Sequence, residues 1–254
     1  MKPYFIIFLS IFMIFMSCRS KKDTLYLQDI NQNIITQLRF EAPTIQANDI
    51  LKITVSALDP SAALPYNKVS QSVGNTTNLA LLRLEGYEVS EQLSIQFPQI
   101  GTLFVNDKTP SQLALVIKQR LESEGHLIKP VVNVRLLNAK FTILGEVARP
   151  GTYNFTESKL TFLQAIGLAG DLTINGQRKN IKLIREIDHQ RTVFYIDLTA
   201  SDWMSSDSYY IHPNDVIIID PNNPKVKSAG FIGNVGTAVT VVSVLLSTII
   251  LLTR

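Results

Sequence analysis

The C-terminal stretch 231–252, FIGNVGTAVTVVSVLLSTIILL, contains no charged side chain. From Val235 to Leu252 it is apolar apart from Gly, Ser and Thr. A helix of this length, at ~1.5 Å per residue, matches a hydrocarbon core of roughly 30 Å. Charge-free runs this long are uncommon in soluble domains. We therefore expect residues 231–252 to form a transmembrane helix.

Small and weakly polar side chains fall on one face of this expected helix when its residues are placed at 100° intervals. Three interpretations of this stripe remain open. It packs against another helix, it lines a watery passage enclosed by a ring of copies, or the helix stands alone in lipid. The first two predict an oligomer. The candidates for pore lining or helix packing are Gly236, Thr237, Thr240, Ser243 and Ser247.

The N-terminal stretch 1–17 has a different pattern. Lys2 precedes an uncharged run from Tyr4 to Met16, and the small residue Ser17 stands immediately before Cys18. A basic start, a short apolar run and a small residue at its end are typical of a secretory signal peptide. We expect residues 1–17 to be absent from the mature protein.

Cys18 is the only cysteine of the chain, so no intramolecular disulfide can form. The run Phe15-Met16-Ser17-Cys18 stands where a lipobox would be and resembles a bacterial lipoprotein signal. This resemblance implies that Cys18 is the lipid attachment site and carries palmitate among its acyl chains. The alternative is an uncleaved N-terminal anchor with an incidental cysteine. We expect the polar residues 18–40 that follow to form a tether.

The charge of the chain is nearly balanced, at a formal net +3, and no Lys/Arg cluster is interleaved with aromatic residues. Nucleic-acid binding therefore has no support. Between the two apolar ends the composition is that of an ordinary soluble protein. The remaining length is enough for one large or two small extracytoplasmic domains.

Periodicity and turn chemistry predict the elements between the two ends. A helix is expected to begin after Thr109, with Pro110 at its first position and Gln112 completing a capping box, and to end at Gly125. Residues 58–85 are expected to be an exposed loop, and a second helix is expected at about 160–169. Strands are expected at 45–55, twice within 93–105, at 131–137, 141–147, 181–187, 191–198 and 216–220.

The ordered series from Ile45 to Leu137 resembles the polysaccharide-export domain of Wza-type outer-membrane polysaccharide-export lipoproteins. The matching features are the turn and strand at 48–55, the Phe97-Pro98-Gln99-Ile100-Gly101 corner, the Thr109-Pro110 helix, and Pro130-Val131-Val132-Asn133-Val134. The family usually has Pro-Gly-Asp where this chain has Ala47-Asn48-Asp49, and an Asp-Gly where it has 94–96. The resemblance implies an export domain over residues 41–137.

The following run, Gly145-Glu146-Val147-Ala148-Arg149-Pro150-Gly151-Thr152-Tyr153, resembles the soluble-ligand-binding β-grasp (SLBB) domain that follows in this family. We expect two strands joined by a Pro-Gly turn, with Gly151 at positive φ. The resemblance implies an SLBB domain over 138–222. The expected fold class is α+β: two small β-rich periplasmic modules with a C-terminal transmembrane helix. A weak internal repeat, Ile45 to Ile50 against Ile211 to Val216, supports two β-rich modules.

Residues typical of catalysis or metal binding are not arranged for either. None of His126, His189 and His212 is spaced with another His or Cys for metal ligation. The sequence holds no nucleophile elbow, phosphate-binding Gly-rich loop or His-Glu-x-x-His. The set Glu85, Glu88 and Glu91 surrounds a loop and is expected to be a solvated surface. Aromatic residues that can stack on sugars, and that in β-rich domains more often belong to cores, are Tyr87, Tyr153, Trp203, Tyr209 and Tyr210.

The resemblance implies a non-enzymatic function without cofactor or metal: an outer-membrane translocon component that exports capsular polysaccharide or exopolysaccharide. Copies are expected to form a homo-oligomeric ring with a helical membrane pore, lipid-anchored, with the bulk in the periplasm. The implied partner is an inner-membrane chain-length regulator with its tyrosine kinase. The alternative is a monomeric glycan-binding or scaffold envelope lipoprotein whose final helix only anchors it. An enzyme acting on the glycan is a third interpretation that no residue favours.

Overall fold

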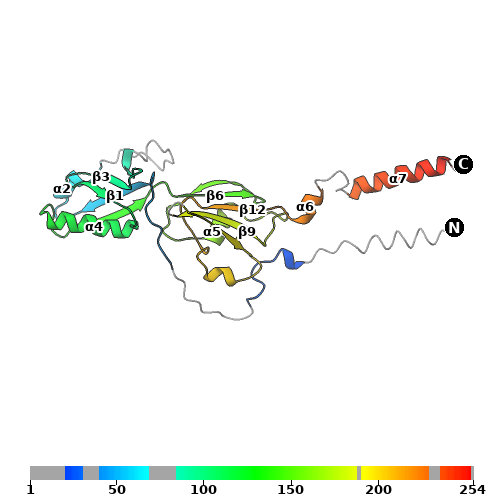
Figure 1. The fold of residues 1–254 in the computed structure, drawn as a ribbon, viewed down its shortest axis with the longest axis horizontal. Coiled ribbons are helices and arrows are strands. Elements are labelled where there is room, and N and C mark those ends of the chain that lie inside the picture. Colours follow the sequence, from blue (N-terminus) through cyan, green and yellow to red (C-terminus); the bar gives the residue numbers. More distant parts are fainter. Residues whose placement is uncertain (1–20, 31–39, 69–83, 188–189, 229–234, 253–254) are drawn as a thin grey trace.

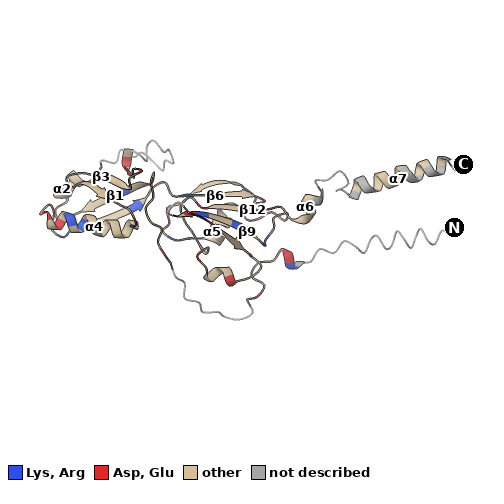
Figure 2. Cartoon of the chain, in the orientation of Figure 1, with Lys and Arg blue, Asp and Glu red and all other residues tan. Residues whose placement is uncertain are grey.

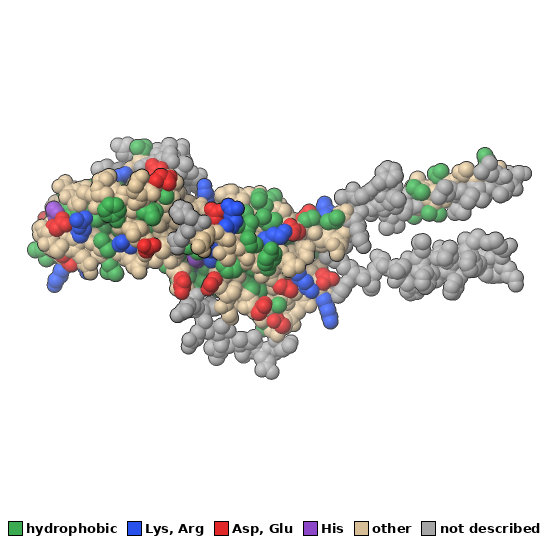
Figure 3. Space-filling view, viewed as in Figure 1, with side chains coloured by type: hydrophobic (Ala, Val, Ile, Leu, Met, Phe, Trp, Pro, Cys, Tyr) green, Lys and Arg blue, Asp and Glu red, His purple; other side chains and the backbone are tan. Residues whose placement is uncertain are grey.

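The computed structural model describes residues 21–30, 40–68, 84–187, 190–228 and 235–252. Two modules lie end to end (Figure 1). The buried core of the first module lies between Ile45 and Val134, and that of the second module between Ala139 and Ile219. Each module has a hydrophobic core of its own. Basic and acidic residues are interspersed over both modules (Figure 2). On the face drawn in Figure 3, hydrophobic side chains lie among polar and charged ones.

The first module is built on an antiparallel sheet in the order β2-β1-β5. Its strands are β1 (Ile50–Ser56), β2 (Tyr87–Glu88) and β5 (Val131–Leu136), and a separate hairpin pairs β3 (Ser94–Phe97) with β4 (Gly101–Phe104). The short helices α2 (Pro60–Ala63) and η2 (Leu64–Tyr66) lie in the predicted loop. The rest of that loop, at 69–83, lies outside the described residues.

Helix α4 (Pro110–Ser123) confirms the predicted capped helix. The Thr109 side chain accepts from the backbone N–H of Gln112, and the Gln112 side chain accepts from the backbone N–H of Thr109. These two bonds satisfy donors that a helix start otherwise leaves unpaired. One face of α4 then closes the core against the sheet, through Leu113, Ile117 and Leu121, each with 0% of its surface exposed.

The second module is built on a five-stranded sheet in the order β10-β9-β12-β6-β7. Strands β12 and β6 run parallel, and every other neighbouring pair in this sheet is antiparallel. Helix α5 (Phe162–Leu168), capped by Thr161, contributes Phe162, Ala165 and Ile166 to the core. The strands are β6 (Lys140–Gly145), β7 (Gly151–Asn154), β9 (Ile181–Ile187), β10 (Gln190–Ile196) and β12 (Val216–Ile219), with β8 (Leu160–Thr161) paired to β11 (Tyr210–Ile211) and η3 (Asp202–Ser205) between β10 and β11.

The predicted hairpin across Pro150-Gly151 is confirmed, because β6 and β7 pair with Ile143 opposite Gly151. The prediction of a positive φ at Gly151 is wrong. The left-handed residue is Gly145, at φ +95°, where β6 ends beside β12. An added Cβ there would lie 2.0 Å from the backbone oxygen of Ile219. The glycine is therefore required by the close approach of β12, which sequence patterning does not reveal.

Residues 26–29, within the expected tether, lie against the second module. The backbone N–H groups of Leu27 and Gln28 donate to the carbonyl oxygens of Leu198 and Thr199 at 2.9 and 2.8 Å. The Tyr26 hydroxyl donates to a carboxylate oxygen of Asp171 at 2.5 Å. This part of the tether is thus bound along the second module, beyond the end of β10.

Helix α6 (Asn223–Ser228) follows the second module, and helix α7 (Val235–Leu252) comes after α6 in the chain. The 3-10 helix η1 (Lys21–Asp23) and α6 lie at the same end of the second module, away from the first module (Figure 1). Helix α7 occupies the predicted C-terminal position. Within the residues that the structure describes, however, no helix meets the combined length and apolarity of a membrane span, so the predicted crossing is not supported.

Candidate functional site

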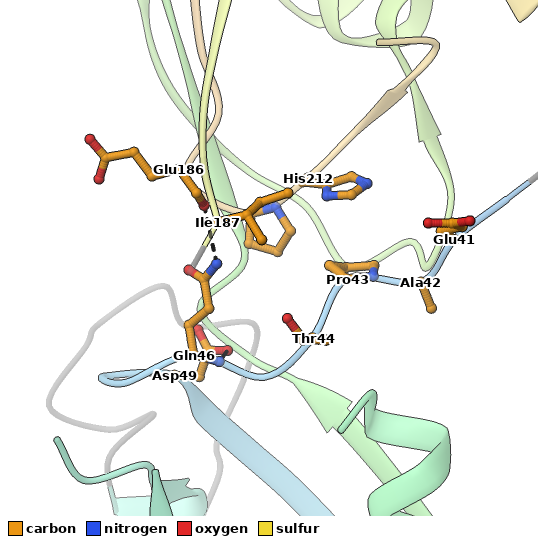
Figure 4. Close-up of a pocket in the computed structure, with 10 residues that line it drawn as sticks. Glu41, Ala42, Pro43, Thr44, Gln46, Asp49, Glu186, Ile187 and His212 are labelled. Carbon is orange, nitrogen blue, oxygen red and sulfur yellow. Dashed lines mark hydrogen bonds between the residues drawn. The ribbon is translucent and has the colours of Figure 1, made fainter. Parts of the chain in front are cut away.

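A cavity of about 160 Å³ lies where the two modules meet (Figure 4). Polar side chains from both modules line it, and a hydrogen bond crosses it from Gln46 Nε2 to the Glu186 carbonyl oxygen at 3.4 Å. Its lining residues are Glu41, Ala42, Pro43, Thr44, Gln46 and Asp49 from the first module, and Glu186, Ile187, His212 and Pro213 from the second.

The first module presents the turn Gln46 to Asp49 to this cavity. Asn48 has φ +67°, a conformation that Asn tolerates better than most residues. The Asp49 side chain folds back and accepts the backbone N–H of Gln46 at 2.9 Å. Asn138, the first residue after the first module, donates to the Asn48 carbonyl oxygen at 3.0 Å and fixes the turn against the second module.

The second module presents a turn of the same form, His212 to Asp215. Asn214 has φ +68°, and the Asp215 side chain accepts the backbone N–H of His212 at 2.8 Å. The internal repeat of the sequence is therefore a repeat of local geometry. Residues of both turns line the same cavity, Asp49 from one and His212 from the other.

The two aspartates differ in their electrostatic environment. Asp215, 1% exposed, accepts two hydrogen bonds from Arg185, from Nε at 2.9 Å and from Nη2 at 2.8 Å. Burial raises the pKa of Asp215, while the Arg185 guanidinium favours its charged form. Asp49 is also buried, and the described residues place no cation within ion-pair distance of it. Burial raises the pKa of Asp49 to about 6, opposed by the N–H of Gln46.

His212 has the opposite shift. Burial, together with the positive charge of Arg185, lowers the pKa of His212 to about 4. Its imidazole is therefore neutral at pH 7, as is usual for a partly buried histidine near an arginine. The cavity holds carboxylates, a hydroxyl and a neutral imidazole, which suits hydrogen bonding to hydroxyl-rich ligands.

These two shifts predict opposite pH dependences of stability. Between pH 4 and 6 folded Asp49 binds more protons than unfolded Asp, so its contribution falls as pH rises. Folded His212 binds fewer protons than unfolded His, so its contribution rises with pH. Between pH 4 and 6, each group changes the free energy of unfolding by about 2 kcal/mol, since one pKa unit corresponds to about 1.4 kcal/mol.

We expect the Asp49→Asn variant to gain stability from pH 4 to 6.5, relative to wild type, and His212→Gln to lose it over the same range. Chemical denaturation at each pH, followed by far-ultraviolet circular dichroism, which reports on the secondary structure of both modules, measures both slopes. Parallel pH profiles for wild type and both variants would contradict the assignment.

The predicted site residues are only partly placed by the structure. Cys18, like His189, lies outside the described residues. On α7 the hydroxyls of Thr240, Ser243 and Ser247 are exposed, and each donates at 2.8 Å to the carbonyl oxygen four residues earlier. Gly236 is exposed and its carbonyl is the acceptor for Thr240, whereas the side chain of Thr237 is not described. Pore lining and helix packing stay predictions for this stripe.

The other candidates are placed individually. Trp203 and Tyr87 are buried at 5% exposed, as expected for core aromatics, and Tyr153, Tyr209 and Tyr210 are partly buried. His126 packs edge-on against Tyr66 and lies 3.4 Å from Glu124. Glu85 and Glu91 contact Lys52 and Asn48. No group of three or more His, Cys, Asp or Glu within the described ranges could hold a metal ion.

Sequence reasoning did not single out Asp49, Arg185 or Asp215 as site residues. The repeat Asn-Asp at positions 48–49 and 214–215 was the available signal, because it marks a left-handed Asn followed by a capping Asp. Arg185 had no local signal, since an arginine in an alternating strand normally faces solvent.

Two family models match the chain. Residues 41–137 match "Polysaccharide biosynthesis/export protein", and residues 140–197 match "SLBB domain". The chain is 31% identical over 150 residues to the EPS I polysaccharide export outer membrane protein EpsA of Ralstonia nicotianae, covering 56% of this chain and 38% of that protein. It is 27% identical over 214 residues to the capsule polysaccharide export outer membrane protein CtrA of Neisseria meningitidis serogroup B, covering 82% of this chain and 52% of that protein. The chain thus spans about half, or less, of these relatives.

Proposed function

Because the chain belongs to the polysaccharide biosynthesis/export proteins, with the export domain followed by an SLBB domain, we propose that it exports capsular polysaccharide or exopolysaccharide at the outer membrane. The ordered pair of matching domains carries this proposal. The relatives named above are polysaccharide export outer membrane proteins by description, and the matches cover 38% and 52% of their lengths.

The site between the modules supports binding rather than chemistry. The Asp49 carboxylate is oriented by a backbone N–H, and a neutral His212 faces the same cavity. Weak and repeated polar contacts are what a conducting wall requires, because a tightly held polymer would not move. In this proposal the protein guides the glycan and makes or breaks no bond.

The finer part of the proposal is a homo-oligomeric ring anchored at the outer membrane through a lipidated Cys18, with the bulk of each copy in the periplasm. The position of residues 21–30 supports a common anchored end, because Lys179 Nζ lies 3.8 Å from a carboxylate oxygen of Asp23, and Asp23 shares a cavity with Asn222 and Asn223. The N-terminal segment and the start of α6 therefore leave the second module together.

In this arrangement the first module points away from the membrane, toward the inner side of the periplasm. An inner-membrane chain-length regulator with its tyrosine kinase is the proposed partner at that end. The α7 helices gather at the anchored end, where valines 239, 241, 242 and 244 are exposed in the single copy.

A complementation experiment tests the proposal. In a host strain lacking this protein, the full chain is expected to restore surface polysaccharide, and a chain ending at Lys227 is expected to fail although it is made and exported. Surface and cell-associated polysaccharide are measured separately, and polymer is expected to accumulate inside the truncated strain. Unchanged surface polysaccharide in the strain lacking the protein would exclude an export function.

The mass of detergent-extracted particles tests the ring. A discrete multimer with closed outlines in electron micrographs is the expected result. If the extracted protein is a monomer that binds polysaccharide, the ring is contradicted and the protein is a glycan-binding or scaffold lipoprotein instead. Shortening or modification of the polymer by the purified protein would establish an enzyme instead.

A further inference from the structure

Arg178 is a buried cation whose charge the described residues do not balance. It is 7% exposed, in the segment leading into β9. Nη1 donates to the carbonyl oxygens of Thr173 and Gly176 at 2.7 and 2.6 Å. Its buried Nε has no acceptor, and no carboxylate of the described residues lies within ion-pair distance of the guanidinium. The guanidinium carbon also lies 5.9 Å from the centroid of the Tyr26 ring, a cation–π contact that supplies no opposite charge. A buried charge is costly without an opposite charge, and no ion pair balances this one within the described residues.

Arg178 lines a cavity of about 260 Å³ at the end of the second module that carries η1 and α6. Lys179, Asn223 and Asp23 line the same cavity. The Lys179 side chain is 49% exposed and lies 3.8 Å from the Asp23 carboxylate, which is 53% exposed. An exposed pair at this separation is weak, typically below 1 kcal/mol, so a better anion can displace Asp23.

We propose that this cavity binds a phosphate group, and that the phosphate belongs to a lipid headgroup. A phosphate oxygen is the acceptor that guanidinium and ammonium groups bind most strongly, through charge-assisted hydrogen bonds. Arg178 supplies a fixed buried charge, Lys179 a second, half-exposed cation, and Asn223 an exposed amide. The bound phosphate balances the charge that Arg178 carries into the interior.

The position of the cavity favours a lipid as the source of the phosphate. Its walls come from the N-terminal segment, through Asp23, and from the start of α6, through Asn223. The N-terminal segment follows the apolar stretch 1–17, and α6 precedes the apolar stretch 231–252. The choice of a lipid rests on the proposed function, in which this end faces the outer membrane. A free phosphate ion has the same chemistry and is the alternative source.

The first test measures phosphate binding by the full chain in detergent, free of other phosphate. Thermal unfolding is followed by Trp203 fluorescence while inorganic phosphate replaces chloride at constant ionic strength. We expect a saturable rise of the midpoint in the wild type. Lys179→Gln is expected to weaken apparent affinity about tenfold, because it removes one charge-assisted contact. Asp23→Asn is expected to tighten it several-fold, because it removes the competing carboxylate.

Lys182→Gln is the matched control. Like Lys179→Gln, it removes one positive charge, in this case from β9. Lys182, however, pairs with Asp220 at 2.6 Å and does not line the cavity. Its midpoint shift with phosphate is expected to equal that of the wild type. The opposite responses at positions 179 and 23 are a pattern that loss of structure alone would not produce. A midpoint independent of phosphate in all four proteins would overturn the proposal and leave Arg178 solvated by water.

The second test distinguishes the sources with dihexanoyl phosphatidylglycerol below its micelle concentration. The lipid assignment is supported if this lipid binds Asp23→Asn more tightly than the wild type, and Lys179→Gln more weakly, as phosphate is expected to do. Binding of inorganic phosphate alone would overturn the lipid assignment. Neither test measures export. If the purified chain binds no phosphate although it restores surface polysaccharide in the host strain, this inference alone is refuted. Intact binding by a chain that does not restore surface polysaccharide would refute the proposed function alone.

Discussion

Gly145→Ala is expected to destabilise the second module by about 3 to 5 kcal/mol, the sum of a strained backbone and a steric clash. Gly145 has φ +95°, and an added Cβ would lie 2.0 Å from the carbonyl oxygen of Ile219. The obstacle is backbone, so no side-chain rotation relieves it. Either β12 must separate from β6 or the end of β6 must change its path.

Trp203 is the only tryptophan of the chain and lies buried in the core of the second module. Urea unfolding followed by its fluorescence therefore reports on the module that contains Gly145. Gly151→Ala is the matched control in the partner strand β7, where an added Cβ meets nothing within 4 Å and φ is not positive. It is expected to change stability by less than about 0.5 kcal/mol. Equal midpoints for the two alanine variants would refute the close approach of β12.

Asp215→Asn is expected to cost about 3 kcal/mol, because it leaves the Arg185 guanidinium buried without its anion. The exposed fractions of the Arg185 and Asp215 side chains are 3% and 0%. Arg185 also donates to the carbonyl oxygens of Asp207 and Tyr210, at 3.0 and 2.7 Å. The pair therefore joins β9 to Asp207, to the first residue of β11 and to the turn that faces the cavity.

The double variant Arg185→Met with Asp215→Asn tests that explanation. If the cost of Asp215→Asn comes from an unpaired buried charge, removing Arg185 as well should recover part of it, so the two effects are less than additive. Arg191→Gln is the control, since Arg191 pairs with Glu186 at exposed positions, 68% and 62%, and is expected to change stability by less than about 0.5 kcal/mol. Additive costs in the double variant would show that the charge pairing is not the cause.

The features predicted correctly from sequence are those that neighbouring residues specify. The capping box of α4 needs only Thr109 and Gln112, three positions apart, and the β9-β10 hairpin needs only two alternating runs and a turn. The order of such local elements was also sufficient to identify the two domains. Period and capping chemistry act within a few residues, so a sequence displays them directly.

The features that only the tertiary structure decided depend on residues far apart in the chain. Gly145 is required by Ile219, the Asp215 carboxylate needs Arg185, and Tyr26 is held by Asp171. Arg178 looks like an ordinary surface arginine in the sequence, and only the folded chain buries it beside a cavity. Burial and close approach are set by how distant segments pack, and a residue's chain neighbours carry no record of them. Sequence therefore determined which domains form, while packing determined where charge is buried and which glycine cannot change.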